Sequence, residues 1–374
     1  MKYDYDVVII GGGLAGLTAA LHLAKNKYNV LVIEKNQYPN HKVCGEYVSN
    51  EVVPYLDCLG IALPSAGAAS INHLLLSTTD GNHLKAELPL GGQGISRYTL
   101  DDILYNEALS NEVDFLFEDA AQVLFKYSFF EVVTGFSKST TSRIVLGAYG
   151  KRSTLDKKLN RRFIATKSSW MAVKSHYEYA YFPENQVALH NFQGGYGGLS
   201  KTESGAVNFC YLASYESFKK EKNIESFNSH VVAQNPFLKE FLANAKPLFE
   251  QPLTIAQISF EPKSIVENHV LMCGDSAGLI HPLCGNGMAM AIHSAKIAAE
   301  CIHDFFTNGA ENRQVLEQRY SKQWQKAFKK RLWYGRQLQR LLLQPKLSSY
   351  ALSLIIKQPA IVNKIIKATH GQPL

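Results

Sequence analysis

Two glycine-rich segments hold the residues best suited to bind a charged ligand. The first, Gly11 to Gly16, reads GGGLAG and follows the apolar run VVII. The second follows the apolar run VLMCG and contains Asp275 and the turn Gly285-Asn286-Gly287. A carboxylate beside a buried strand needs a partner, and glycine lets the backbone approach a ligand closely. We therefore expect the two segments to meet and to share one ligand.

The first segment has the pattern of a dinucleotide-binding strand, loop and helix. Val7 to Ile10 is typical of a buried parallel strand, and Leu14 to Ala24 repeats apolar residues at helical spacing. Gly11 permits a tight turn, Gly13 lets the backbone approach a pyrophosphate, and Gly16 allows the helix to pack closely on the strand. The free N–H groups at the helix start can then bind phosphates.

A carboxylate follows the next predicted strand. Asn29 to Ile33 is apolar and ends at Glu34, where a carboxylate can accept hydrogen bonds from a ribose. The glycine motif alone is a weak signal for a cofactor, because a glycine-rich turn can also occur without any ligand. Strand, loop, helix, strand and acid together favour a nucleotide cofactor, without separating NAD from FAD.

The second segment favours a flavin. After Asp275, Pro282 and the Gly285-Asn286-Gly287 turn lead into a long apolar helix predicted over Met288 to Phe306. The N-terminus of such a helix stabilises negative charge, which reduced flavin carries. A plain connection within the core would explain the apolar spacing, but not the Asp and the glycines.

Length and composition limit the class of protein. With 374 residues, 46% of them hydrophobic, the chain can form two domains. The N-terminus lacks the basic start of a signal peptide, and no stretch reaches the 18 apolar residues typical of a membrane span. The six cysteines have neither CxxC nor zinc-site spacing, so we expect no metal site and a reduced, cytoplasmic protein.

The net charge of +7 is unevenly distributed. Residues 319–374 contain twelve Lys and Arg and no Asp or Glu, whereas the remainder has 27 basic and 32 acidic residues. Such a basic tail can contact anionic lipid at the inner membrane face, or an acidic carrier or electron-transfer protein. Helices that merely cap another domain with a solvated basic face are the alternative. Nucleic acid is not expected, because no binding module accompanies the charge.

Five motifs together resemble the FAD-dependent oxidoreductases of the para-hydroxybenzoate hydroxylase fold, and within them the geranylgeranyl reductase-like branch. The motifs are GGGLAGLTAA with Glu34, KVCGE (42–46), SRYTLDDIL (96–104), GAYGKRS (147–153) and GDSAGLIHPLCGNGMAMAI (274–292). The resemblance implies an α/β fold: a Rossmann-like FAD-binding domain, an inserted antiparallel-sheet substrate domain of α+β type, and a helical C-terminal tail.

The resemblance also suggests how the chain is divided. The antiparallel region contains alternating aromatic runs such as HYEYAYF and VNFCYL, separated by turn-like PENQ and TESG. We predict an FAD-binding domain of residues 1–70, 95–155 and 265–310, a substrate domain of residues 71–94 and 156–264, and a basic amphipathic tail of residues 311–374.

The resemblance assigns FAD to residues of both glycine segments. Glu34 would bind the adenosine ribose, Asp275 the ribityl chain or pyrophosphate, and Gly285 to Gly287 the flavin's pyrimidine edge. Arg97 would lie near the FAD phosphates. The complete predicted set is Gly11, Gly13, Leu14, Ala15, Gly16, Glu34, Lys35, Arg97, Asp275, Gly285, Asn286, Gly287 and Met288.

Two further groups of residues are candidates for the substrate side. Cys44 and Glu46 of KVCGE could supply a proton after hydride delivery, although a small buried cysteine is often inert. Glycines weaken a strand, so the glycine-rich run at 194–198 could mark a close approach of the backbone to flavin or substrate. The predicted pocket residues are Gly195, Tyr196, Gly197, His281 and Pro282, with simple packing as the alternative for His281.

Two departures from the family pattern bear on the reaction. GAYGKRS has Tyr149 where the family has Asp, which leaves the electron donor open between NAD(P)H and a reduced protein partner. The aromatic motifs YxWxFP and GWxWxIP are absent from Gly194 to Leu212, so halogenation is not expected.

We expect an FAD-dependent oxidoreductase that exchanges hydride between flavin N5 and an apolar prenyl- or acyl-like substrate. The alternatives are a flavin-dependent aromatic hydroxylase and a non-catalytic lipid-chain binder of the same fold.

Overall fold

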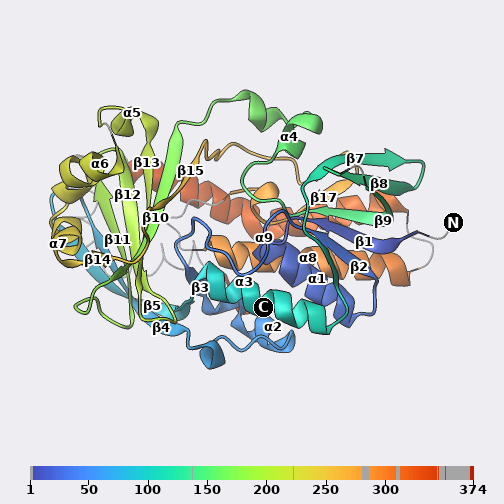
Figure 1. Ribbon diagram of the computed structural model, residues 1–374, viewed down its shortest axis with the longest axis horizontal. Helices are drawn as coiled ribbons and strands as arrows, with labels where there is room; N and C mark the ends of the chain where they lie inside the picture. The colour runs from blue at the N-terminus through green and yellow to red at the C-terminus, as the bar shows by residue number, and fades with distance from the viewer. Residues whose placement is uncertain are drawn as a thin grey trace.

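The chain forms two sheets with flanking helices (Figure 1). The structure is a computed structural model that describes residues 3–136, 138–221, 223–279, 286–308, 312–342, 344, 350 and 371–374. The predicted α/β architecture, with a parallel-sheet half, a second sheet and a helical C-terminal region, is confirmed.

The first sheet aligns the ends of its parallel strands at one edge. Its order is β16-β17-β9-β1-β2-β6, and β7 and β8 extend it beside β9. β1 runs parallel to β2 and β9, and β17 runs parallel to β9. Ligands bind parallel sheets at the carboxyl ends of the strands, so the loops after β1, β9 and β17 are placed for binding. The strands are β1 (Tyr5–Ile10), β2 (Val30–Ile33), β6 (Asp114–Leu116), β7 (Ala120–Lys126), β8 (Phe129–Thr134), β9 (Ser139–Gly147), β16 (Val266–Glu267) and β17 (Val270–Met272).

The helices that cover this sheet follow the apolar periodicity of the sequence. α1 (Leu14–Lys25) and α8 (Gly287–Thr307) pack together and are largely buried, as the sequence predicts. α3 (Arg97–Ser110) packs on α1, and α9 (Arg313–Leu342) packs on α8. Two shorter helices are α2 (Val53–Cys58) and α4 (Thr154–Lys158). Among the described residues, no helix is both long enough and apolar enough to cross a bilayer.

The second sheet is antiparallel except for one pair. Its order is β14-β10-β13-β12-β11-β4-β5-β3, and β15 pairs with β10. β11 lies parallel to β4 because the chain crosses to the first sheet and back between them, so no hairpin joins the two strands. The strands are β3 (Tyr47–Ser49), β4 (Ala69–Ser77), β5 (His83–Gly94), β10 (Trp170–Glu178), β11 (Gln186–Phe192), β12 (Gly195–Lys201), β13 (Val207–Ser214), β14 (Lys246–Pro247) and β15 (Leu253–Ala256).

The outer face of the second sheet is closed by aromatic side chains. Helices α5 (Tyr215–Phe218), α6 (Ile224–His230) and α7 (Pro236–Asn244) lie on it (Figure 1). The inner face of the sheet is therefore the one left to meet the loops of the first sheet. The buried rings on the outer face include Phe192, Phe209, Tyr211, Phe227 and Phe241.

Three buried or largely buried histidines make the fold sensitive to acid. Burial is the largest cause that lowers the pKa of His22 to about 4, of His190 to about 3 and of His293 to about 4. The folded protein keeps these rings neutral, whereas the unfolded chain binds protons below its ordinary histidine pKa of about 6.5. The unfolded state then binds more protons, so stability falls as the pH drops from about 6.5 towards 4.

We predict that His190→Gln flattens the acid side of the stability profile. His190 lies against Ser77 Oγ (2.7 Å) and stacks on Phe237, so the variant loses stability at every pH. The slope of unfolding free energy against pH between 6 and 4 should nevertheless fall by about 1.4 kcal/mol per pH unit, since one proton fewer is taken up on unfolding. Urea unfolding at several pH values measures the slope. His73→Gln, at an exposed position, is the control; an unchanged slope in His190→Gln would contradict the prediction.

Candidate functional site

The two glycine-rich segments meet at the carboxyl edge of the first sheet, as expected. A Cβ placed on Gly11 (φ +102°) would lie 2.5 Å from the carbonyl oxygen of Ala148, in the loop after β9. A Cβ on Gly274 (φ +59°) would lie 2.9 Å from Cβ of Ala15, in the first turn of α1. The loops after β1, β9 and β17 therefore touch one another, and their glycines allow it.

Within the first loop, the glycines have different surroundings. A Cβ on Gly16 would overlap the carbonyl oxygen of Gly11, so Gly16 is required for packing, as predicted. Gly13 differs, because the nearest atom to its Cβ position is Arg97 Nη2 at 3.5 Å. A space beside a guanidinium at a helix N-terminus suits an anionic group such as a phosphate.

Glu34 holds the first loop in shape. Its carboxylate accepts hydrogen bonds from the backbone N–H groups of Gly12 (2.7 Å) and Asn36 (3.1 Å). The hydroxyl of Tyr38 donates to the carbonyl of Gly12 (2.5 Å). Glu34 lies at the end of β2, where the sequence places it, while the neighbouring Lys35 is exposed.

Arg97 is fixed by a buried carboxylate that the sequence interpretation did not identify. Asp101 accepts two bonds of 2.7 Å from the guanidinium and one of 3.0 Å from Lys42. Burial alone would lower the pKa of Arg97, but Asp101 and, after it, Cys44 and Asp275 raise it above its usual value. Arg97 is thus a permanent cation facing Gly13. The i, i+4 spacing of Arg97 and Asp101 on one helix was the available signal.

Asp275 follows β17 as predicted, but it is partly exposed instead of buried. Its backbone carbonyl accepts a bond from Lys263 Nζ (2.7 Å), and no hydrogen bond from a described residue reaches its carboxylate. That carboxylate can therefore accept a hydroxyl group of a ligand without breaking an existing bond. Beyond it, Asn286 caps α8, Gly287 begins the helix and Met288 is buried, whereas Gly285, His281 and Pro282 lie outside the described residues.

Tyr149 directs its hydroxyl into the protein. Its oxygen lies 3.4 Å from Met272 Sδ and accepts a bond of 3.4 Å from Arg161. Burial is the largest cause that raises the pKa of Tyr149. The next residue, Gly150, donates to Ser276 Oγ (2.9 Å), which links the loop after β9 to the Asp275 loop. Tyr149 thus places a half-buried neutral ring where the family pattern has a small acid.

The KVCGE segment bridges the two sheets through its backbone. Three successive carbonyls accept hydrogen bonds from side chains of three different elements. Gly45 is exposed, and a Cβ there would meet no atom within 4 Å, so the segment borders open space. The bonds are Lys151 Nζ to Val43 (3.2 Å), Asn208 Nδ2 to Cys44 (3.2 Å) and Ser200 Oγ to Gly45 (3.2 Å).

Glu46 is the centre of a buried ionic cluster. Its carboxylate accepts hydrogen bonds from Lys174 Nζ (2.6 Å), His176 Nε2 (2.6 Å) and the backbone N–H of Arg97 (2.9 Å). Burial would raise the pKa of Glu46, but the bonds and charges of His176 and Lys174 outweigh it and lower the pKa. An ionised, fully bonded carboxylate is poorly suited to donate a proton, which disfavours the catalytic role predicted for Glu46.

His41 completes the cluster. Its ligating nitrogen, the Glu46 carboxylate and a His176 nitrogen lie within 4.8 Å of one another, a set that could hold a metal ion. Burial, followed by the charges of Lys174 and His176, lowers the pKa of His41 to about 4. Because the ammonium of Lys174 already occupies Glu46, a divalent cation there would add repulsion to a buried site, and we interpret the group as an ionic network.

The inner face of the second sheet is apolar beside this cluster. Tyr196 is buried there with Ala172, Leu212 and Ile258. Gly195 and Gly197 have a packing explanation, because Cβ atoms on them would overlap the rings of Phe192 and Phe209 on the outer face. Their place in a substrate pocket stays a prediction. These glycines make room for core aromatics, and a ligand is not needed to explain them.

Residues 4–327 match a family model described as an FAD binding domain. The chain belongs to this FAD-binding family. It is an FAD-dependent oxidoreductase, and the room beside Gly13, the cation of Arg97 and the partly exposed carboxylate of Asp275 suit the anionic and hydroxyl groups of FAD.

This FAD-binding enzyme is similar in sequence to reductases, and in fold to a brominase and a probable monooxygenase. It is 24% identical over 349 residues to a digeranylgeranylglycerophospholipid reductase of Methanosarcina acetivorans, covering 87% of this chain and 81% of the relative. The flavin-dependent brominase Bmp2 superposes with a TM-score of 0.79 at 18% identity (98% and 93% of the chains). Pseudomonas aeruginosa pqsL, a probable FAD-dependent monooxygenase, gives 0.75 at 17% (93% and 99%). The structural likenesses show the fold alone.

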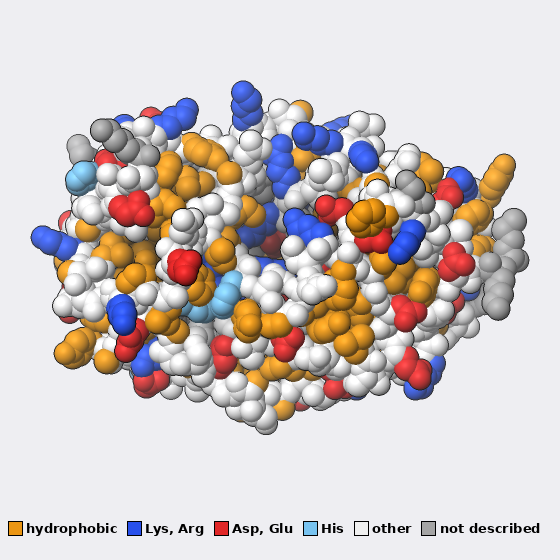
Figure 2. All heavy atoms as spheres, in the orientation of Figure 1, with side chains coloured by type: hydrophobic (Ala, Val, Ile, Leu, Met, Phe, Trp, Pro, Cys, Tyr) orange, Lys and Arg blue, Asp and Glu red, His pale blue; other side chains and the backbone are white. Residues whose placement is uncertain are grey.

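The space-filling view of the FAD-binding enzyme shows a hollow near the middle of one face, with Lys and Arg side chains gathered along it (Figure 2). Described cations near the converging loops include Lys151 and Lys263, whose ammonium groups donate to backbone carbonyls. Burial is the largest cause that lowers the pKa of Lys263 to about 8. The site therefore has basic side chains around it and an apolar wall on one side.

We predict that Asp275→Asn weakens FAD binding. The variant keeps the size of the side chain but removes a charged acceptor, worth roughly 1.5 to 3 kcal/mol, or about 10- to 100-fold in Kd. Titration of the apoprotein with FAD, followed by flavin fluorescence, measures the change. Asp57→Asn, on the exposed face of α2, is the control. Equal FAD affinity in the Asp275 variant and in the wild type would show that this carboxylate does not contact FAD.

We also predict strong coupling between Glu46 and Lys174. Glu46→Gln leaves a buried ammonium without its counter-charge, which should lower the free energy of unfolding by about 3 to 5 kcal/mol. Glu46→Gln with Lys174→Met removes both charges, so the double variant should lose less than the sum of the single losses. Urea unfolding of the four proteins gives the coupling energy. Glu107→Gln, which breaks the more exposed pair with Lys25, should change little; additive losses at Glu46 and Lys174 would refute the network.

Proposed function

We propose that this enzyme is a reductase of an apolar prenyl- or acyl-type chain. The observation that carries the proposal is the apolar wall of Ala172, Tyr196, Leu212 and Ile258 beside the KVCGE segment, with Val43 and Leu279 packed against it. A chain without polar groups could lie against Val43 and Leu279, the partly buried side chains that cover this wall, without leaving protein donors unpaired. The similarity to the Methanosarcina relative, a digeranylgeranylglycerophospholipid reductase, supports the same substrate class.

In this proposal, four residues hold the cofactor. The guanidinium of Arg97 and the open backbone at Gly13 receive the phosphates, and Asp275 accepts a hydroxyl group of the ribityl chain. Bound FAD supplies a hydride equivalent at N5. Glu34 acts through the loop that it braces, and its carboxylate has lone pairs left for the adenosine ribose.

The KVCGE segment borders the substrate. Saturating a double bond needs a hydride on one carbon and a proton on the other, and Cys44 is the proton donor that we propose. Its carbonyl is held by Asn208, and its side chain is half-buried. Glu46 keeps the segment in place as an ionised anchor.

A flavin-dependent monooxygenase is the second candidate. The buried polar cluster of His41, Lys174 and His176 could bind a phenol-like substrate, and the fold is shared with the probable monooxygenase from Pseudomonas aeruginosa. This candidate requires oxygen in every turnover, whereas the reductase does not.

Anaerobic single turnover separates the two candidates. The enzyme is photoreduced, so that the outcome does not depend on the natural electron donor, and is mixed under nitrogen with a geranylgeranyl lipid. We predict oxidation of the flavin and a product that gains two hydrogens for each flavin oxidised. Cys44→Ser should slow this step without changing the flavin content, while Cys58→Ser, at an exposed position, is the control.

The reverse pattern would support the monooxygenase. In that case the flavin stays reduced under nitrogen, and admission of labelled oxygen places one labelled atom in an aromatic probe such as a hydroxybenzoate. A geranylgeranyl lipid that is neither bound nor saturated by the reduced, correctly folded enzyme would refute the reductase proposal.

A further inference from the structure

One long helix of the C-terminal region has two chemically opposite faces. The buried face of α9 carries Leu316, Tyr320, Trp324 and Phe328 at intervals of four residues, and it packs on α8. The opposite face carries Lys322, Lys326, Lys329 and Trp333, at the i, i+4, i+7 and i+11 spacing of one stripe. All four residues of this basic stripe are exposed, and Trp333 is 51% exposed.

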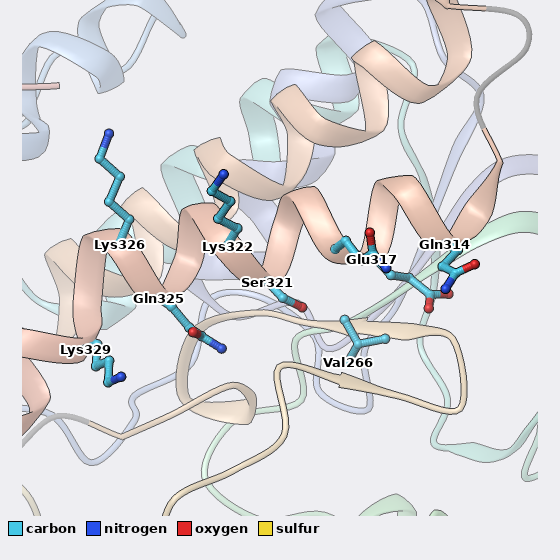
Figure 3. A pocket seen from close by; sticks show the side chains of 9 residues that line it. Val266, Gln314, Glu317, Ser321, Lys322, Gln325, Lys326 and Lys329 are labelled. Atoms are coloured by element: carbon cyan, nitrogen blue, oxygen red, sulfur yellow. The ribbon is translucent and has the colours of Figure 1, made fainter.

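A groove of about 710 Å³ lies along the basic stripe, between α9 and β16. Figure 3 shows Ser321, Gln325 and Lys329 pointing towards the strand that carries Val266, while Lys322 and Lys326 point away from it. Amide, hydroxyl and ammonium donors thus line the groove. Such donors bind the phosphate and hydroxyl groups of a polar headgroup.

The charge of the stripe is not neutralised locally. Within the part of the chain that the structure describes, Lys322, Lys326 and Lys329 form no ion pair with a carboxylate. Glu317, the acid in the groove, is paired with His269 (2.7 Å). The rest of the chain beyond residue 318 adds no Asp or Glu. A row of cations that no described carboxylate pairs with favours an extended anionic partner.

We propose that the basic stripe of α9 binds the surface of an anionic phospholipid bilayer, with lipid phosphates beside the lysines and Trp333 at the headgroup level. Two observations favour lipid over an acidic protein. Trp333 and Tyr334, which is 44% exposed, stand beside the lysines, and Trp and Tyr prefer the membrane interface. The sequence from 343 onwards, including YALSLIIKQPAIVNKIIK, continues with apolar residues and lysine as its only charged type.

The inference goes beyond the proposed reaction and does not depend on it. The apolar face of α9 is already used inside the protein, so binding rests on the lysines, each worth about fivefold in affinity for an anionic surface, and on the aromatic side chains. Such binding should weaken as salt is added, because exposed charges are screened.

Vesicle sedimentation tests the proposal with the full-length, FAD-loaded protein. We predict binding to vesicles of phosphatidylcholine mixed with phosphatidylglycerol, and little binding to phosphatidylcholine alone. Lys322→Gln/Lys326→Gln/Lys329→Gln should reduce binding on the order of 100-fold. The matched control, Lys219→Gln/Lys220→Gln/Lys239→Gln, makes the same change in net charge at exposed positions near the second sheet and should bind like the wild type. Circular dichroism and flavin content establish that both variants fold.

A second measurement separates lipid from acidic protein. Trp333→Ala keeps every charge, so it should weaken vesicle binding and remove the blue shift of tryptophan emission that accompanies it. Equal binding to both kinds of vesicle, or equal losses in the two triple variants, would overturn the proposal. So would binding to polyaspartate, unaffected by Trp333→Ala, without binding to anionic vesicles. Protein that reduces a prenyl probe but ignores vesicles would refute this inference alone.

Discussion

The buried carboxylate of Glu46 is the interaction on which the arrangement of the two sheets depends. It accepts bonds from Lys174 and His176 on β10 of the second sheet, and from the backbone N–H of Arg97 at the start of α3. Glu46 itself has a φ of +53°, a conformation that costs energy for a residue with a side chain. Three strong donors offset that strain and the desolvation of the charge. Loss of the carboxylate would break the contacts of the KVCGE segment with β10 and with α3 at the same time.

This constraint also sets the geometry of the cofactor site. The α3 N-terminus is held by two carboxylates, because Glu203 accepts bonds from Ser96 and Thr99 while Glu46 binds the backbone of Arg97. With its backbone fixed, Arg97 can extend along α3 to Asp101 and face Gly13. A single residue thus connects the anchor of the second sheet to the cofactor loop. Changes at Glu46 are therefore expected to affect both FAD binding and the apolar wall of the second sheet.

The sequence was sufficient to predict those features that depend on a few neighbouring residues. The roles of Gly11 and Gly16 in chain geometry, the place of Glu34 after a strand and the extent of α8 follow from patterns of a few residues, and the structure has these features. The KVCGE motif correctly singled out Glu46, but it suggested a catalytic role that the structure disfavours. The motif could not show the ionic partners of Glu46, because Lys174 and His176 lie far along the chain. Lys174 and His176 are two residues apart on a strand and therefore lie on the same face. That spacing was the only local sign of a charged cluster. The sequence did not show that Gly195 and Gly197 make room for aromatic rings, because those rings come from other strands.

In the C-terminal region, an amphipathic sequence alone does not show what the apolar side of the helix contacts. Alternating apolar and basic residues in residues 313–342 are equally consistent with a helix that lies in a membrane and with one that covers a core. In the structure, the apolar side of α9 is occupied by α8, so this segment cannot use the same side to enter a bilayer. The remaining side offers cations and an exposed Trp, which can bind a charged surface without displacing any internal contact. Contact with a bilayer through α9 would thus be electrostatic and reversible, and it would leave the buried core, including the Glu46 network, unchanged.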